Sequence, residues 1–234
     1  MVNLNEYLSS NSYPGRGVAI GKSADGENAV LVYFIMGRSV NSRNRIFVES
    51  DGVIKTKAFD ESKLTDPSLI IYAPVRVYNN NTIVTNGDQT DTVYNALSSG
   101  LTFEEALRTR RYEPDEPNFT PRISGIASIN EGKLTYKLSI LKKTAVSDGC
   151  GRFFFEYSEP ANGVGHIIHT YKTDGEPIPS FEGEPVAFYI NDNFDDFADS
   201  IWNALNTDNK VSLFVRSISL KNATIKTKIY NKHN

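Results

Sequence analysis

An arginine-rich segment, residues 37–45, has the composition of an anion site. It reads Gly37-Arg38-Ser39-Val40-Asn41-Ser42-Arg43-Asn44-Arg45 and follows a long apolar run. Guanidinium groups bind phosphate oxygens through paired hydrogen bonds, and Ser and Asn side chains add neutral donors. The segment therefore predicts binding of a phosphate or a similar anion, and a solvated hairpin tip is the alternative.

A second polar segment, Asn86-Gly87-Asp88-Gln89-Thr90-Asp91, joins a predicted strand to a predicted helix. Gly87 would let the backbone approach a ligand closely, and amides at the start of a helix favour negative charge. Capping of the helix by Asp88 or Thr90 is the alternative. Capping alone does not account for two carboxylates and two amides, so the segment is a candidate binding site.

The third polar segment, residues 112–122, is acidic and contains three prolines. Glu113, Asp115 and Glu116 fall within four residues, and Asn118 and Arg122 follow them. Neighbouring carboxylates repel one another, which raises the pKa of at least one of them if water is excluded. A proton-transfer enzyme needs such a group. An acidic surface loop stiffened by prolines is the alternative.

The elements that must position these side chains are mostly strands. Apolar and polar residues alternate, Val, Ile, Phe and Tyr are frequent, and turn sequences such as Asn130-Glu131-Gly132 separate the runs. The predicted strands are residues 16–21, 29–36, 69–78, 82–85, 123–129, 134–141, 152–157, 165–171, 185–190, 211–218 and 223–230.

Helical spacing predicts three helices, at residues 90–97, 102–111 and 194–205. Gly100 suits the end of the first helix, and Thr102 with Glu105 forms a capping box that opens the second. The third carries an apolar stripe from Phe194 to Leu205, which is typical of core packing. Strands joined by short turns, followed by helices and more strands, predict an α+β fold of mostly antiparallel sheets covered by helices, in one domain.

Composition and charge exclude several classes of protein. The 234 residues include 25 Lys and Arg and 28 Asp and Glu, which gives a net charge of −3. A general nucleic-acid binder usually has a pI above about 9. No apolar run approaches the roughly 20 residues of a membrane span, and the N-terminus lacks the basic and apolar regions of a signal peptide. We expect a cytoplasmic protein that binds neither nucleic acid nor membranes.

Few residues are suited to hold a metal or to act as a nucleophile. Cys150 is the single cysteine, which excludes an internal disulfide and any multi-cysteine metal site. His166 and His169 lie three apart on a predicted strand, so their side chains should point to opposite faces. Gly21-Lys22-Ser23 lacks the first glycine of a phosphate-binding loop, because Arg16 stands in its place. We therefore expect no metal site.

Taken in order, these segments resemble the archaeal-type IMP cyclohydrolase family, which closes the purine ring in the last step of IMP synthesis. The resemblance rests on Gly15-Arg16 with Gly21, the Arg-Ser-x-x-x-Arg-Asn-Arg block that begins at Arg38, Tyr72, the Asn-Gly-x-x-Thr-Asp block that begins at Asn86, and the Tyr-Glu-x-Asp-Glu-x-Asn-x-Thr-Pro-Arg-Ile block that begins at Tyr112. It is strongest over residues 13–130, and residues 1–12 are a short N-terminal extension to a domain that spans residues 1–234. Residues 40–45 depart from the usual Ser-Phe-Pro-Asn-Arg of the family.

The resemblance implies a fold and a reaction. The fold would be a four-layer αββα sandwich similar to N-terminal-nucleophile hydrolases, without their self-processing nucleophile. The reaction would be dehydrative ring closure of 5-formamidoimidazole-4-carboxamide ribotide to IMP, with no metal or other cofactor. The ligand would be this purine nucleotide, and the oligomeric state, including a homo-oligomer, stays open.

The resemblance also assigns roles to residues. Oxyanion stabilisation and proton transfer would fall to Arg45, Tyr72, Glu113 and Glu116. The substrate-binding candidates are Arg16, Arg38, Ser39, Arg43, Asn86, Gly87, Asp88, Asp91, Asp115, Asn118 and Arg122. Two other functions fit the same scaffold, namely hydrolysis of another small amide and nucleotide binding without chemistry.

Overall fold

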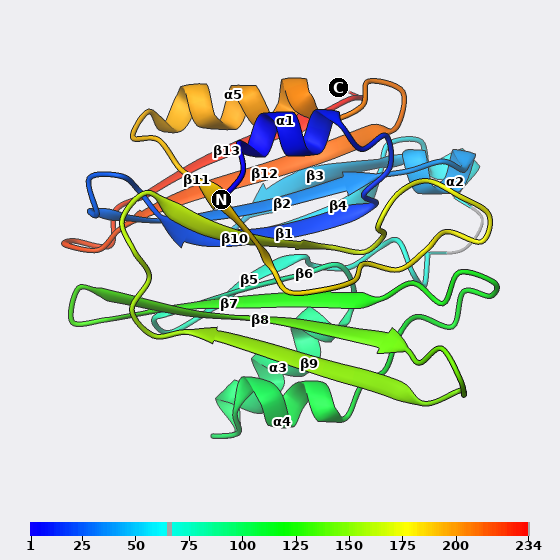
Figure 1. Cartoon of the computed structure of the whole chain (residues 1–234), viewed down its shortest axis with the longest axis horizontal. Helices are drawn as coiled ribbons and strands as arrows, with labels where there is room; N and C mark the ends of the chain where they lie inside the picture. Colours follow the sequence, from blue (N-terminus) through cyan, green and yellow to red (C-terminus); the bar gives the residue numbers. More distant parts are fainter. Residues whose placement is uncertain (65–66, 234) are drawn as a thin grey trace.

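Two β-sheets stacked on one another form the centre of the computed structural model, which describes residues 1–64 and 67–233 (Figure 1). In the first sheet the strand order is β11-β10-β1-β2-β12-β13, and all neighbouring strands are antiparallel. The strands of this six-stranded sheet are β1 Arg16–Lys22, β2 Asn28–Met36, β10 Val164–His169, β11 Val186–Tyr189, β12 Lys210–Ser219 and β13 Ile225–Asn231.

The second sheet has seven strands in the order β3-β4-β5-β6-β7-β8-β9, again antiparallel throughout. Its strands are β3 Arg45–Ser50, β4 Val53–Ala58, β5 Val75–Tyr78, β6 Asn81–Thr85, β7 Arg122–Asn130, β8 Lys133–Lys143 and β9 Cys150–Tyr157. Each strand pairs with the one that follows it in the chain, although η1 lies between β4 and β5 and two helices lie between β6 and β7. The prediction of an α+β fold with mostly antiparallel sheets is confirmed.

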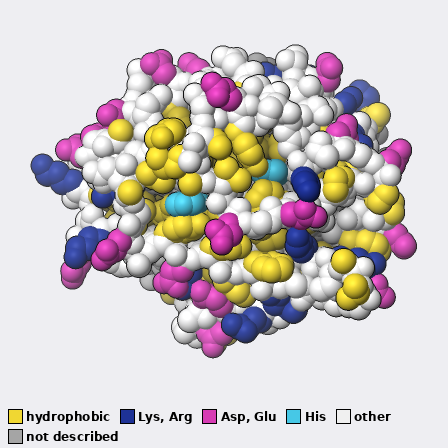
Figure 2. Space-filling model, in the orientation of Figure 1, with side chains coloured by type: hydrophobic (Ala, Val, Ile, Leu, Met, Phe, Trp, Pro, Cys, Tyr) yellow, Lys and Arg dark blue, Asp and Glu magenta, His cyan; other side chains and the backbone are white. Residues whose placement is uncertain are grey.

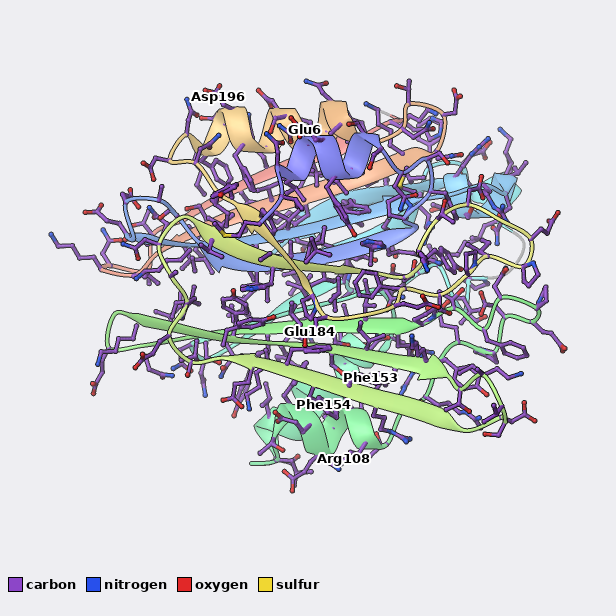
Figure 3. The ribbon with its side chains drawn as sticks, in the orientation of Figure 1. Glu6, Arg108, Phe153, Phe154, Glu184 and Asp196 are labelled. Atoms are coloured by element: carbon purple, nitrogen blue, oxygen red, sulfur yellow. The ribbon has the colours of Figure 1, made fainter. Side chains whose placement is uncertain are left out.

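The helices cover the outer faces of the two sheets. Helices α1 Leu4–Ser9 and α5 Phe194–Ala204 lie over the six-stranded sheet, and α3 Gln89–Ser98 and α4 Phe103–Arg108 lie over the seven-stranded sheet (Figure 1). Figure 3 shows this arrangement through Glu6 and Asp196 on one side of the molecule and Arg108 on the opposite side. The short helix α2 Val40–Arg43 and the 3₁₀ helix η1 Glu61–Lys63 lie in connections between strands.

Apolar side chains that point inward at every second position of the strands form the core between the sheets. Val18 and Ile20 of β1 belong to the same buried cluster as Tyr136 and Leu138 of β8, and these four side chains are at most 1% exposed. Because side chains in a strand alternate between faces, the intervening residues point outward and pack under the helices. The central strands β1, β2, β7 and β12 are therefore buried on both faces, which accounts for their apolar character, whereas β9 and β13 have no buried residue.

Several local predictions are confirmed. The side chains of Thr102 and Glu105 form the capping box at the start of α4, and Gly100 has a φ of +79° after the end of α3. Phe197 and Ile201 of α5 are buried in the core of the outer layer. The apolar stripe of α5 is thus a packing surface.

The two neighbouring histidines point to opposite faces of β10, as predicted from their spacing. The ring of His166 hydrogen-bonds the Tyr136 hydroxyl between the sheets, at 2.7 Å. The ring of His169 bonds the hydroxyl of Tyr7 on α1, at 2.6 Å. Among the residues that the structure describes, no group of three or more His, Cys, Asp or Glu side chains is arranged to hold a metal ion.

Sequence reasoning missed the hairpin of β3 and β4 and the helices α1 and α2. The hairpin turns at Asp51 and Gly52, whose φ values are 53° and 75°. An Asp-Gly pair between two alternating runs is a strong signal for a two-residue hairpin turn, so the sequence contained the evidence for it. The anion-site interpretation of residues 37–45 concealed that Arg45 already begins a strand.

The predicted strand 69–78 is wrong in its first half. Only Val75–Tyr78 forms a strand, and residues 69–74 are irregular. Pro74 interrupts the predicted run and has no N–H to donate to a neighbouring strand. Instead, Thr56 of β4 holds this segment through its backbone N–H, which donates to the Tyr72 carbonyl at 2.9 Å.

Charged side chains are mixed over the surface. Acidic and basic groups alternate on the face shown in Figure 2, and neither sign dominates it. Strand β13 is an edge strand, and Lys226 and Lys228 of this strand form ion pairs with Asp195 of α5. No helix in the described part of the chain has the length and apolar character needed to span a membrane.

Candidate active site

Three buried arginines lie near one end of the two stacked sheets. Arg16, Arg45 and Arg122 are each the first residue of a strand, β1, β3 and β7. Their exposed fractions are 8%, 0% and 6%. Buried guanidinium groups are costly unless they are paired and hydrogen-bonded, so their partners decide what this cluster can do.

Not all hydrogen-bond donors of the Arg45 guanidinium have a partner among the described residues. Its Nε donates to the Ser42 carbonyl at 2.8 Å, and Ser42 is fixed because it forms a capping box with Ser39 around α2. The terminal nitrogens Nη1 and Nη2 are buried and have no hydrogen-bond partner among the described residues. Burial lowers the pKa of Arg45, and the positive charge of Arg16 acts in the same direction. Two buried donors are thus available to an acceptor that is not part of the protein.

Tyr72 lies beside Arg45 and is rigidly held. Its backbone N–H donates to the Thr56 hydroxyl at 2.8 Å, and its own hydroxyl bonds that of Tyr33 at 2.7 Å. Burial raises the pKa of Tyr72 despite the nearby positive charges of Arg45 and Arg16. The phenol is therefore protonated at neutral pH and can donate a hydrogen bond. Because Tyr33 belongs to β2 and Tyr72 precedes β5, the two hydroxyls join one sheet to the other.

Glu113 supplies the buried carboxyl of the cluster. It is 1% exposed, and its Oε1 has no hydrogen-bond partner in the described part of the chain. Burial raises its pKa to about 7, although the charges of Arg16 and Arg122 oppose the rise. A carboxyl with this pKa can accept and return a proton near neutral pH.

Arg16 faces Glu113. Although burial lowers the pKa of Arg16, the combined electrostatic effects of Glu113, Tyr171, Tyr72 and Tyr13 outweigh burial and raise this pKa. The backbone N–H of Arg16 donates to the Thr170 hydroxyl at 3.1 Å, and its side-chain Nε has no partner among the residues described. Arg16 therefore offers a further buried donor next to the proton-transferring carboxyl.

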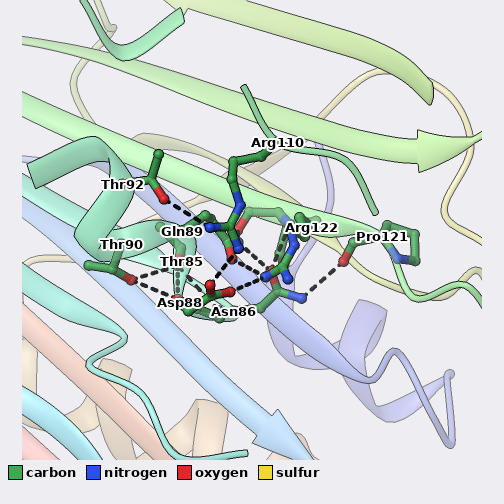
Figure 4. Close-up of polar contacts among 11 residues, drawn as sticks. Thr85, Asn86, Asp88, Gln89, Thr90, Thr92, Arg110, Pro121 and Arg122 are labelled. Atoms are coloured by element: carbon green, nitrogen blue, oxygen red, sulfur yellow. Dashed lines mark hydrogen bonds and ion pairs between the residues drawn. The ribbon is translucent and has the colours of Figure 1, made fainter. Parts of the chain in front are cut away.

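The segment between β6 and α3 holds Arg122 in place (Figure 4). Nη1 of Arg122 donates to Asp88 Oδ1 and to Gln89 Oε1, each at 2.7 Å, and Arg110 donates to the other oxygen of Asp88 at 2.5 Å. Although burial raises the pKa of Asp88, the hydrogen bonds and charges of Arg110 and Arg122 hold it below its ordinary value. Asn86 fixes the same turn, because its amide donates to the Pro121 carbonyl at 2.9 Å.

Gly87 is required by this packing. A Cβ atom at position 87 would lie 2.6 Å from Gln89 Oε1 and 2.7 Å from Arg122 Nη1, closer than real Cβ contacts. It would also lie 3.5 Å from Glu113 Oε1. Gly87 thus permits the close approach of its backbone to the side chains of Gln89 and Arg122.

Several residues that were predicted to bind the ligand instead form contacts within the protein. Arg38 pairs with Asp174 at 2.7 Å, and Arg43 donates to the Gly37 carbonyl at 2.8 Å and to Asn209. Ser39 caps α2. Asp91 pairs with Arg76 and is half exposed, so the structure does not bring it to the arginine cluster.

The remaining predicted residues belong to the loop that carries Glu113. Asp115 accepts hydrogen bonds from the backbone and side chain of Thr120, which closes the loop. Asn118 accepts from the Ile178 N–H at 3.2 Å and ties the loop to residues 174–179. Glu116 is exposed and lines a neighbouring pocket. Of the predicted proton-transfer residues in this loop, only Glu113 is buried with the arginines.

A pocket of ≈ 680 Å³ adjoins this loop, and sequence reasoning missed most of its charged residues. Its wall includes Arg110, Arg111, Arg122 and Lys143, together with the two residues on either side of Glu113, Tyr112 and Pro114. Tyr33 was also missed, because a tyrosine within an apolar strand gives no sign that its hydroxyl meets Tyr72. Arg111 and Lys143 lie outside the recognisable motifs, and only the fold brings them together.

The cluster combines three features that suit acyl chemistry. Buried donors on Arg16 and Arg45 can stabilise negative charge on oxygen, the Tyr72 phenol adds a neutral donor, and Glu113 can transfer protons. The buried cluster also carries a net positive charge, because Glu113 has a pKa of about 7 and is only partly ionised at neutral pH. An anionic or oxygen-rich ligand would complete the site.

Comparison with known proteins agrees with this geometry. A family model described as "IMP cyclohydrolase-like protein" matches residues 13–222. A protein of Methanopyrus kandleri named IMP cyclohydrolase is 31% identical over 192 residues, which cover 73% of this chain and 89% of the relative. An IMP cyclohydrolase of Methanococcus aeolicus is 25% identical over 152 residues, or 62% of this chain and 74% of the relative. An IMP cyclohydrolase of Methanothrix thermoacetophila is 34% identical over 123 residues, or 50% of this chain and 58% of the relative. The chain belongs to the IMP cyclohydrolase-like protein family.

Proposed function

We propose that this protein is an IMP cyclohydrolase, which closes the ring of 5-formamidoimidazole-4-carboxamide ribotide to give IMP and water in purine biosynthesis. The family and the names of the relatives support this activity. The observation that carries the proposal is the buried group of Arg45, Tyr72 and Glu113, which has unpartnered donors beside a carboxyl with a pKa of about 7. A purine nucleotide is therefore the substrate.

In the first step the carboxamide nitrogen attacks the formyl carbon of the same molecule. A nitrogen–carbon bond forms, the formyl oxygen gains negative charge, and the nitrogen loses a proton to Glu113. The free nitrogens of Arg45 and the Tyr72 phenol would donate to the developing oxyanion. Because the two reacting groups are on one molecule, the enzyme mainly selects the rotamer in which they meet.

In the second step water leaves. The oxyanion takes up a proton from solvent and becomes a hydroxyl, protonated Glu113 donates a second proton to it, and the carbon–oxygen bond breaks. The formamido nitrogen releases its proton to solvent as it forms the double bond to the former formyl carbon, and the carboxamide nitrogen keeps its second proton. Glu113 thus accepts a proton in one step and returns it in the next, which requires a pKa near the working pH. Arg16 would stabilise the ionised form of Glu113 before the first step and after the second.

Other parts of the sequence interpretation belong to the same proposal. Asn86, Gly87, Asp88 and Arg122 would shape the wall that contacts the nucleotide, and Asp115 and Asn118 would act by holding the loop of Glu113. The layered fold is the basis for proposing a scaffold similar to N-terminal-nucleophile hydrolases, with residues 1–12 as an extension of one domain. A cytoplasmic location is part of the proposal.

A direct assay tests the function. Purified protein is incubated with the formamido ribotide, and formation of IMP is measured by chromatography with and without added divalent metal. We expect IMP to form without metal, and to form at least about 10²-fold more slowly with Glu113→Gln. Glu116→Gln is the matched control, because Glu116 is exposed on the same loop. Absence of IMP with the wild-type protein would overturn the proposal, and release of formate instead would favour an amidohydrolase.

A further inference from the structure

The pocket beside the Glu113 loop contains cations that the chemistry proposed above does not use. Arg111 and Lys143 both line it, and neither has a buried carboxylate partner. Lys143 pairs with Asp148 at 3.0 Å, but the Asp148 side chain is 91% exposed. Arg111 donates to the carbonyl of Asp148 and to the hydroxyl of Tyr112. An ion pair with so exposed a partner contributes little, so a stronger anion can replace the carboxylate.

The other cations near the reacting group are less available. Arg110 and Arg122 share the two oxygens of Asp88, and Arg38 and Arg43 are engaged as described above. Arg45 and Arg16 are buried beside Glu113, where the reacting end of the substrate would lie. Among the described residues that line the pocket, Arg111 and Lys143 are therefore the cations best placed to exchange their present contacts for an anionic ligand.

The pocket adjoins that site. Tyr112 and Pro114, which flank Glu113 in the chain, form part of its wall, and so does Arg122. Arg122 interacts electrostatically with Glu113, and a Cβ atom at position 87 would lie 2.7 Å from Arg122 Nη1 and 3.5 Å from Glu113 Oε1. A ligand that extended from Glu113 past Arg122 would reach the pocket with its other end, as a nucleotide does when ribose separates its base from its phosphate.

We infer that Arg111 and Lys143 bind the 5′-phosphate of the nucleotide, in place of the Asp148 carboxylate. This inference rests on the proposed function for the identity of the ligand. Arg111 would supply a guanidinium fork and Lys143 a compact point charge, a combination suited to a phosphate dianion. Lys143 also lies 3.7 Å from the centre of the Phe119 ring, which fixes the ammonium at the pocket wall.

Binding of IMP and of inosine, which lacks the phosphate, tests this assignment. Isothermal titration calorimetry gives both dissociation constants for the wild type, Arg111→Gln and Lys143→Met. We expect each substitution to weaken IMP binding by about 10-fold or more and to leave inosine binding unchanged, because a hydrogen bond to a charged group is lost. Lys172→Met is the matched control, since Lys172 forms an exposed pair with Glu182 at 2.8 Å and should change neither constant.

A second variant makes the test independent of any loss of fold. Asp148→Asn removes the competing carboxylate and keeps the backbone carbonyl that Arg111 contacts. We expect it to bind IMP a few-fold more tightly and inosine as before. Equal weakening of IMP and inosine by Arg111→Gln and Lys143→Met, or no change in either, would overturn the inference.

The same measurements separate this inference from the proposed function. If wild-type protein forms IMP from the ribotide but the variants keep the wild-type ratio of IMP to inosine affinity, only the phosphate assignment fails. If the ratio collapses in the variants but the wild type forms no IMP, the assignment stands and the cyclohydrolase activity fails.

Discussion

Replacement of Arg45 by methionine should stabilise the protein while it abolishes most of the activity. Arg45 is 0% exposed and has two buried terminal nitrogens without partners in the described structure. Methionine has a similar length and fills irregular gaps, so it removes the buried charge with little change in volume. A residue kept in spite of its energetic cost is expected where function requires it.

The size of the effect follows from the hydrogen bonds. Each buried donor without a partner costs about 1 to 3 kcal/mol, so the two nitrogens of Arg45 cost about 2 to 6 kcal/mol. Loss of the bond from Nε to the Ser42 carbonyl offsets about 1.5 to 3 kcal/mol of this. The midpoints of these two ranges differ by about 2 kcal/mol, which is the net gain that we expect in the free energy of unfolding. For 234 residues this corresponds to a rise in Tm of about 4 to 8 °C.

Thermal unfolding and kinetics of ring closure are the two assays. Arg43→Met is the matched control, because the Arg43 guanidinium is hydrogen-bonded to the Gly37 carbonyl and to Asn209. Its loss should lower the Tm, whereas Arg45→Met should raise it and reduce kcat by about 10²-fold or more. A Tm that falls equally in both variants would show that Arg45 has a structural role, and an unchanged kcat would remove it from the reaction.

Three further predictions concern the neighbours of Arg45. The kcat/KM of the wild type should rise with pH through about 7 as Glu113 ionises. Glu113→Gln should lack this rise, whereas Glu116→Gln should keep it. A wild-type profile that is flat from pH 5 to 9 would contradict the role of Glu113. The pKa of Glu113 is raised from 4.5 in the unfolded chain to about 7 in the fold, so the folded state holds an extra proton between these values. Stability should therefore decline as pH rises from about 4.5 to 7, measured by urea denaturation, and Glu113→Gln should decline less. Gly87→Ala should reduce kcat by about 10-fold or more, because its Cβ would displace Arg122 and Gln89, while Gly52→Ala, which has open space, should not affect kinetics.

Patterns within short segments predicted much of the fold. Alternation of apolar residues located most strands, and the capping box at Thr102 and Glu105 located α4. These features depend on residues that are close in the chain, so they can be recognised from the sequence alone. The failures arose where interactions are distant in the chain, as in residues 69–74, which Thr56 holds outside a regular strand.

The site was less accessible to sequence reasoning for the same reason. The segment 37–45 contains three similar arginines, yet only Arg45 turns into the space between the sheets with unpartnered nitrogens. Composition cannot distinguish a guanidinium that stabilises a turn from one that awaits a ligand. The same holds for the acidic loop, where Asp115 closes the loop and Glu113 is buried with a raised pKa.

Because the hydroxyls of Tyr33 and Tyr72 join the two sheets, the geometry of the active site depends on the distance between the sheets. Arg16 and Tyr33 come from one sheet, whereas Arg45, Tyr72 and Arg122 come with the other. Any change in the thickness of the apolar layer, even at Ile20 or Leu138, would move the two halves of the site apart or together. Substitutions there should impair turnover through misalignment well before the protein unfolds, so core packing and catalytic rate must vary together in this fold.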